Sequence, residues 1–410
     1  MKPLFALPVL CLAVLAMPCV ARAQAPVTLE AAIARALHAN PTLRAGVNEA
    51  AAQEGVLAQA GAWPNPELSL LREGQERDTR TSTVTLSIPI ELGGKRAARI
   101  DAATQERQLA LIEADALRVQ LRADTVAAFH DLHVAAERLR MAGEMAALAA
   151  SATHAAARRV EAGKVSPVDE TRARVAEANA RIDALHAARD LDTARLRLAA
   201  LWGGDGAGLE IVAPATSALP EAPPLDRLLA GIDDAPAMRL ARAQVAQRSA
   251  LARVEQARRT PDVSVIVGAR REGPEQRNQA VLGVSVPLPL FDRNHGAVLA
   301  ALRRVDRARD AQDAESVRLR AALTEAHARL STARAEAQLI DAQILPGARS
   351  AARAAQRGFE AGKFGFLDVL DAQRTLFQSQ TQYLNAVAQC HRAAADIARL
   401  SGVSVDQENP

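Results

Sequence analysis

The chain has 410 residues, and its 50 basic and 47 acidic side chains leave a formal net charge of only +3. That balance argues against a nucleic-acid-binding surface, which needs a clustered excess of Lys and Arg. Only 2% of the residues are aromatic, so a globular core would lack its usual bulk, and closely packed helices rich in Ala and Leu are expected instead.

The first 23 residues have the features of a secretory signal peptide. A positive start is followed by an apolar run, and an A-x-A cleavage pattern ends at Ala23. The mature chain is therefore expected to begin at Gln24, outside the cytoplasm. Cys19 would offer a lipid anchor, but Pro18 stands where a lipoprotein signal has a small residue, so lipidation is the disfavoured alternative.

Long stretches of helical periodicity dominate the mature chain. The stretch from Lys95 to about Val160 contains no Pro, and as one helix it would be about 100 Å long at 1.5 Å per residue. Such a length implies coiled-coil packing. A shorter helix is predicted from Ser166 to Leu201, and a last one from about Gly365 to Leu400. A second long helix follows His295, and Pro346 is expected to bend it.

Two short segments in each half alternate apolar and polar residues with a period of two, which predicts two β-hairpins. The strands are expected at about 66–73, 82–91, 262–270 and 280–290. Strands of about 9–10 residues have the length that crosses a bilayer when tilted. Four strands cannot close a barrel, because the smallest membrane barrels need about eight, so several subunits would have to pool their hairpins. The alternative is a small soluble β-subdomain that caps a coiled coil.

The two halves of the chain repeat each other. Glu-Ala-Gly-Lys at 161–164 returns at 360–363, 199 residues later (360 − 161), and Pro64 recurs as Pro261, 197 residues later (261 − 64). Each half predicts a helix, a β-hairpin, a very long helix, a tight turn and a helix. The expected division is a first repeat at 24–204, a linker at 205–224, a second repeat at 225–402 and a polar tail at 403–410.

This plan resembles the TolC-type outer-membrane efflux family over essentially the whole mature length. Besides the duplication, the resemblance rests on four phrases: W-P-N-P-E at 63–67, E-L-G-G-K-R at 91–96, P-L-P-L-F-D-R-N at 287–294 and the segment 360–373. The second and third are most similar to the heavy-metal branch, the CzcC type. The resemblance implies a mainly α fold with a small β part. It also implies a homotrimer with a long periplasmic α-helical barrel and an outer-membrane β-barrel that trimerisation completes.

The resemblance further implies the exit duct of a tripartite, proton-driven efflux pump, which is not an enzyme and uses no cofactor. Its partners would be a periplasmic adaptor (membrane fusion protein), an inner-membrane RND-type transporter and outer-membrane lipid. Heavy-metal cations such as cobalt, zinc, cadmium or copper are the expected substrates. The alternatives are a drug-efflux or type I secretion duct of the same fold, a periplasmic adaptor, or a structural coiled-coil protein. The duplication and the paired hairpins argue against the last two.

The resemblance places a pore entrance beside the second tight turn. Asp368 and Asp371 are three residues apart on one helical face and match an Asp pair that lines the narrow entrance, where three copies would form a negative ring that favours cations. The alternative is that they complement the helix dipole. Asp169, the repeat mate of Asp368, matches a position that helps to hold the entrance closed.

The entrance neighbours depart from the family pattern. Phe364 stands where members can carry an Arg, and Val168 stands where a hydroxyl residue is found. With Phe359 close to the turn as well, a gating latch in this protein must differ from the family latch, and a more apolar one is expected.

The two tight turns are expected to form tips that face the adaptor, although plain solvated turns are the alternative. Gly163 and Gly362 are predicted to supply left-handed turn conformations. The tip residues are Glu161, Gly163, Lys164, Glu360, Gly362 and Lys363.

Three further groups carry weaker hypotheses. His130 and His133 have a spacing seen in helical metal ligands, but no third ligand is apparent, so a packed or solvated pair is favoured and no metal site is predicted. Cys390 would be the one cysteine of the mature chain and is expected to be a small buried residue. The basic residues at 95, 96 and 99 follow a strand, and they either meet anionic head groups or are ordinary helix-surface charges.

Overall fold

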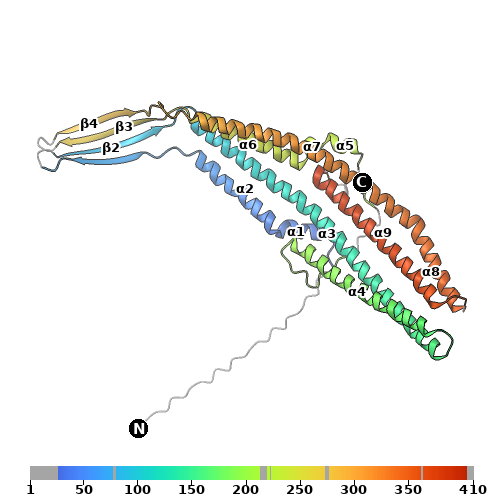
Figure 1. Ribbon diagram of the computed structural model, residues 1–410. Coiled ribbons are helices and arrows are strands. Elements are labelled where there is room, and N and C mark those ends of the chain that lie inside the picture. Colours follow the sequence, from blue (N-terminus) through green and yellow to red (C-terminus); the bar gives the residue numbers. More distant parts are fainter. Residues whose placement is uncertain are drawn as a thin grey trace, which may run out of the picture.

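The computed structural model describes residues 26–76, 80–212, 219–221, 223–272, 277–361 and 363–403. The predicted signal peptide, Gly362 and most of the predicted tail lie outside these ranges. Figure 1 shows an elongated rod of helices with a β-sheet projecting from one end. In the described ranges no helix carries an apolar stretch long enough to cross a membrane.

The first repeat begins with two capped helices. Thr28 Oγ1 accepts the Ala31 N–H at 3.2 Å, and Asn40 Oδ1 accepts the Leu43 N–H at 2.8 Å, which satisfies donors that a helix start leaves free. The elements are α1 (Leu29–Ala39), α2 (Pro41–Ala60), β1 (Glu67–Glu73), β2 (Thr81–Ile90), α3 (Lys95–Glu161) and α4 (Pro167–Ala200). At 67 residues, α3 is about 100 Å long, as predicted.

The second repeat follows the same order with one irregularity. Its elements are α5 (Leu225–Ala230), a 3-10 turn (Ile232–Asp234), α6 (Pro236–Ala257), β3 (Val263–Glu272), β4 (Asn278–Ser285), α7 (His295–Leu339), α8 (Leu345–Glu360) and α9 (Phe366–Ser401). A π-helical turn, Ile340–Ile344, separates α7 from α8. Pro346, the second residue of α8, has no N–H for a regular helix bond. The helix axis curves here in Figure 1, as expected from Pro346.

The four strands form one antiparallel sheet in the order β1-β2-β3-β4. The β2–β3 ladder joins the two repeats over its whole length, from Thr81↔Glu272 to Ile90↔Val263. Residues directly opposite each other share a face, and one such row runs Leu68, Leu86, Val267, Leu282. One face of the sheet is therefore apolar, and it is open: Leu68 is 63% exposed and Leu282 is 80% exposed.

The strand predictions hold to within one or two residues, except at the end of β4. The strand was expected to reach residue 290 and ends at Ser285. Ser285 pairs with Ser264, and β3 begins only one residue earlier. Beyond that point Pro287 and Pro289 have no N–H to donate, so no ladder is available to extend.

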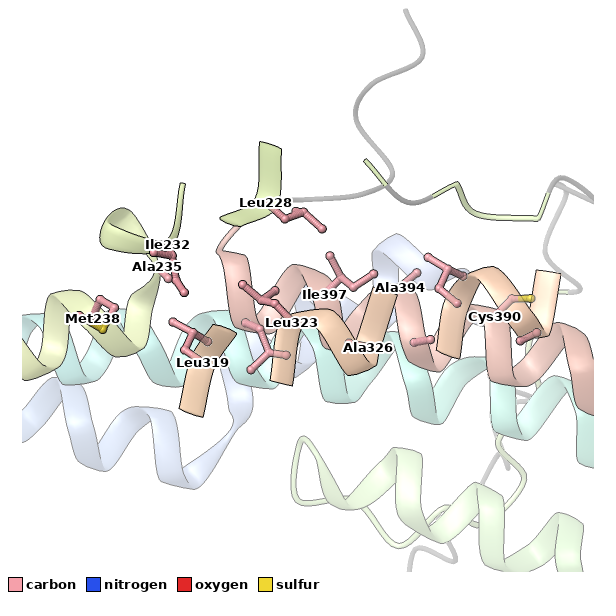
Figure 2. Packing of buried hydrophobic residues seen from close by; sticks show 14 residues of the cluster. Leu228, Ile232, Ala235, Met238, Leu319, Leu323, Ala326, Cys390, Ala394 and Ile397 are labelled. Carbon is pink, nitrogen blue, oxygen red and sulfur yellow. The ribbon is translucent and has the colours of Figure 1, made fainter. Parts of the chain in front are cut away.

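Apolar cores hold each helical hairpin together. In the second hairpin, Leu319, Leu323 and Leu330 of α7 belong to one buried cluster with Cys390 and Ile397 of α9. Figure 2 shows this cluster from close by. Burial raises the pKa of the Cys390 thiol to about 11, and its predicted place as a small buried residue is confirmed.

The first hairpin has a matching core. Phe129 and Leu132 of α3 pack with Leu191 and Leu198 of α4. All four side chains are buried, so each pair of helices is a unit with its own apolar seam.

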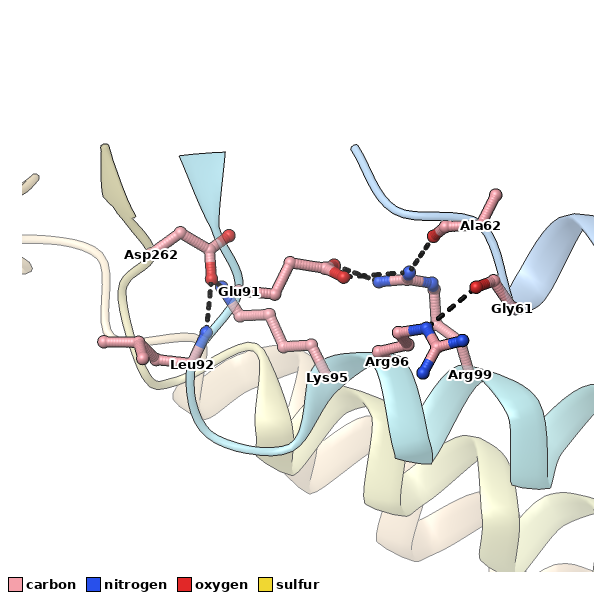
Figure 3. A network of polar contacts seen from close by, with 8 residues as sticks. All are labelled: Gly61, Ala62, Glu91, Leu92, Lys95, Arg96, Arg99 and Asp262. Atoms are coloured by element: carbon pink, nitrogen blue, oxygen red, sulfur yellow. Dashed lines mark hydrogen bonds and ion pairs between the residues drawn. The ribbon is translucent and has the colours of Figure 1, made fainter. Parts of the chain in front are cut away.

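A polar clamp fixes the sheet to the helices (Figure 3). Arg99 donates two hydrogen bonds to the Glu91 carboxylate, one of them 3.0 Å long, and Glu91 is only 11% exposed. Across the repeats, Asp262 accepts the Leu92 N–H at 3.1 Å and pairs with Lys95 at 2.8 Å. These bonds secure the turn that leads from β2 into α3.

Glycine makes that turn possible. Gly93 has a φ of +67°, and a Cβ at this position would lie 2.5 Å from the Thr260 Cβ, so a larger residue would be both strained and obstructed. Arg96 completes the corner by donating to the Gly61 carbonyl at 2.8 Å and lying over the Trp63 ring. The three basic side chains therefore bind the chain's own groups. Contact with anionic head groups stays a prediction.

We expect Arg99→Ala to lower the thermal stability of the detergent-solubilised protein. The substitution leaves the shielded Glu91 carboxylate without its main donor, a loss of about 1–3 kcal/mol. Arg118→Ala is the matched control, because Arg118 forms an exposed pair with Asp115 that contributes little. Melting temperatures by differential scanning fluorimetry check this, and equal losses in the two variants would contradict it.

Candidate functional site at the helical tips

The first tip is a tight turn between α3 and α4. Gly163 adopts the predicted left-handed conformation, with φ +67°, and the next N–H, from Lys164, closes the turn on the Arg159 carbonyl at 2.8 Å. Ser166 then caps α4 by accepting the Val168 N–H at 3.3 Å. Glu161, Gly163 and Lys164 are all exposed, so their side of the turn is accessible.

The second tip folds the chain back by a similar route. The N–H groups of Lys363 and Phe364 both donate to the Gly358 carbonyl, at 2.8 and 3.2 Å. The Phe364 ring lies against Gly358, where a Cβ would be 2.1 Å from the ring. Lys363 is exposed. The predictions for Gly362 and for the Glu360 side chain lie outside the described residues.

The two tips lie at the same end of the rod, opposite the sheet (Figure 1). Asp169 and Asp368 line one cavity of about 240 Å³, whose walls come from α3, α4 and the start of α9. The folded chain thus brings together two of the three predicted acidic residues. Asp368 also accepts the Gly365 N–H at 2.8 Å, so it caps its own helix while it lines the cavity.

Asp371 lies one turn further along α9, apart from this pair. It lines a second cavity, of about 380 Å³, together with Asp183 of α4 and Arg374. Within one protomer the three acidic side chains therefore line two cavities rather than one.

Sequence reasoning missed Arg159, which connects the two tips. Its guanidinium lies over the Phe359 ring, 4.7 Å from the ring centroid, and it lines the cavity that holds Asp169 and Asp368. Such a contact is favourable by about 0.5–1 kcal/mol at an exposed site. A comparison of the two repeats could have singled out Arg159, because its counterpart in the second repeat is Gly358, close to the repeated turn.

The contact between Arg159 and Phe359 is called the latch below. The two other predicted entrance neighbours, Phe364 and Val168, are not buried in it. Phe364 is 49% exposed although its ring covers Gly358, and Val168 is 55% exposed in the first turn of α4. The contact that bridges the hairpins is thus cationic and aromatic, between Arg159 and Phe359. The expected apolar latch, with Phe364 and Val168, stays a prediction for contacts between protomers.

The histidines lie midway along the rod, far from the tips in the sequence. His130 is buried and stacks on His391 of α9, with ring centroids 3.5 Å apart. Burial also lowers the pKa of the neighbouring His133. Among the described residues no group of three or more His, Cys, Asp or Glu has a geometry for holding a metal ion.

The fold is shared with a solved outer-membrane channel. The Campylobacter jejuni CmeC outer membrane channel matches it with a TM-score of 0.79 at 16% identity, over 93% of this chain and 87% of that one. At this identity the match shows a shared fold.

The sequence comparisons assign the family. The family model for outer membrane efflux proteins matches residues 32–204 and 232–403, and the chain belongs to that family. It is 44% identical to the cobalt-zinc-cadmium resistance protein CzcC of Cupriavidus metallidurans, over 93% of this chain and 91% of that one. It is 32% identical to the nickel-cobalt-cadmium resistance protein NccC of Alcaligenes xylosoxydans xylosoxydans, over 68% of this chain and 64% of that one. The predicted family, its heavy-metal branch and the outer-membrane location are confirmed.

Proposed function

We propose that this protein is the outer-membrane exit channel of a tripartite, proton-driven pump that exports heavy-metal cations. One observation carries the proposal: acidic residues of both hairpin tips lie at one end of a rod whose other end is a sheet with an open apolar face. The metal-resistance names of the relatives, CzcC above all, support the choice of substrate. Cobalt, zinc and cadmium are the first candidates.

The sheet end suits a lipid environment. The apolar face of the sheet is uncovered in the protomer. Among the described strands, the outer two, β1 and β4, each pair on one side only. Unpaired backbone groups are too costly in lipid, so strands there must close into a barrel. Three copies supply twelve strands, above the minimum of about eight.

An apolar stripe on α4 supports assembly by identical subunits. Val168, Val175, Ile182 and Leu196 lie at intervals of seven or fourteen residues, and each is at least 50% exposed. Sevenfold spacing keeps residues on one side of a coiled-coil helix. Neighbouring protomers in a trimer would cover this stripe.

We expect Val175→Glu with Ile182→Glu to dissociate the trimer, because two charges would replace apolar contacts between protomers. Light scattering coupled to size-exclusion chromatography in detergent measures the mass of the assembly. The control, Val175→Leu with Ile182→Leu, keeps the stripe apolar and should remain trimeric. A trimer that survives both glutamates would contradict this interface.

The tip end suits the selection of cations. In a trimer, Asp368 and Asp371 would recur three times around one opening, and rings of carboxylates favour cations in pores. The exposed tip residues Glu161, Lys164 and Lys363 would meet the periplasmic adaptor, which joins the duct to an inner-membrane transporter.

Asp368→Asn with Asp371→Asn should reduce the cation-to-anion permeability ratio of single channels in planar bilayers. The amides are nearly isosteric but remove two charges per protomer. Asp192→Asn, near the opposite end of α4, is the control and should leave the ratio unchanged. An unaltered ratio in the double variant would rule out the ring.

The substrate is tested in the host cell. Deletion of the gene should lower resistance to cobalt, zinc and cadmium and leave drug resistance unchanged, and the wild-type gene should restore it. The metal concentration that halves growth is the measurement. Loss of drug resistance with intact metal resistance would instead identify a drug-efflux duct of the same fold.

A further inference from the structure

Midway along the rod, the seam between α3 and α9 contains polar contacts, unlike the apolar cores inside each hairpin. Asp131 of α3 pairs with Arg392 of α9, whose Nε donates to it at 2.7 Å. Seven residues along each helix, Arg138 donates to the Asn385 side chain. This antiparallel seam is where the two hairpins of one protomer meet along the rod.

A third pair of residues, both charged, lies on the sheet side of the Asp131–Arg392 pair. Asp124 lies seven residues before Asp131, and Arg399 lies seven residues after Arg392. Burial raises the pKa of the Asp124 carboxyl, and the charge of Arg399 opposes that rise. Charged or hydrogen-bonding groups therefore recur at three successive levels of the seam.

At the centre of the seam, two imidazole rings lie face to face. His130 and His391 stack with 3.5 Å between ring centroids and 7° between ring planes. The Phe129 ring meets His130 edge-on at 6.0 Å, and His130 is only 6% exposed. A positive charge on the buried His130 ring has no room to be solvated here, so the packed seam holds that ring in its neutral form.

The charges around His130 all oppose its protonation. Burial is the main cause, followed by His391 across the seam and His133 one turn along α3, and together they lower the pKa of His130 to about 3. Two carboxylates of α3 close to His130 in the sequence form ion pairs of their own: Asp131 with Arg392, and Glu137 with Arg140. Among the described residues of α4, which also packs against α3, no charged group contributes to this shift.

We propose that the His130–His391 stack makes the α3–α9 seam sensitive to acid, so that mild acid favours separation of the two helical hairpins of one protomer. The inference concerns the protomer and does not depend on the exported substrate. Separation would expose the His130 imidazole to water, where it can hold a proton, and would end the burial that keeps it neutral.

The size of the effect follows from proton linkage. An exposed histidine titrates near 6.5, whereas packed His130 stays neutral down to about pH 3. Well below pH 6.5, each unit of acidification therefore favours the separated form by about tenfold through His130. From pH 6.5, where an exposed histidine is half protonated, to pH 5.0, the opening equilibrium should rise by about 16-fold through His130 alone.

Hydrogen–deuterium exchange of the purified full-length protein in detergent tests this at pH 7.5, 6.5 and 5.0. After correction for the intrinsic exchange rate, peptides covering 124–138 and 385–399 should exchange faster as the pH falls. His130→Phe with His391→Phe keeps two aromatic rings without a titratable group at the stack, and its seam should respond to acid much less than that of the wild type, with His133 as the remaining histidine of lowered pKa. His186→Phe, at an exposed position on α4, is the matched control and should respond as the wild type does.

Two further variants distinguish an acid response caused by the histidines from one caused by the Asp124 carboxylate. Asp124→Asn removes the seam carboxylate whose pKa is raised by burial, and it should retain the acid response. His391→Gln provides a second test if the double variant does not fold, and it should weaken the response. An acid-insensitive wild-type seam, a double variant that opens like the wild type, or a response lost in Asp124→Asn would overturn the proposal.

Discussion

The pairing of β2 with β3 is the interaction on which the rest of the structure depends. It is the ladder that joins the two repeats, and it aligns them from Thr81↔Glu272 to Ile90↔Val263. Because each strand leads into or out of a long helix, this register sets the relative position of two helical hairpins. The clamp around Asp262 and Glu91 carries that register from the sheet to the helices.

With the repeats aligned at one end, the tips meet at the other. The duplication makes them similar in backbone and different in chemistry. The first supplies Arg159 and Asp169, and the second supplies Phe359 and Asp368, which complete the latch and the cavity. A single repeat would hold neither arrangement: the cavity needs the Asp that both copies share, and the latch needs Arg159 and Phe359, at which the two copies differ.

Much of this could be predicted from the sequence, because helix periodicity, strand alternation and the repeated turn are local patterns. β4 was predicted too long, since its end depends on where β3 starts to pair and not on its own alternation. The roles of Arg99 and His391 were missed for a related reason. Glu91 and Arg99 are eight residues apart across a sharp turn, and His130 and His391 are 261 residues apart, so neither pairing leaves a periodic trace. At the tips, Asp169 and Asp368 could be named from the repeat, but only the fold shows that they share a cavity while Asp371 lines another.

The most direct test of the account is a cryo-electron-microscopy structure of the full-length protein in lipid nanodiscs. The account predicts a threefold assembly with the strands of three chains closed in one barrel within the disc. Asp368 and Asp371 of each chain should then surround the axis at the far end. A monomer, or a trimer whose sheets stay separate and whose acidic residues face outward, would contradict it.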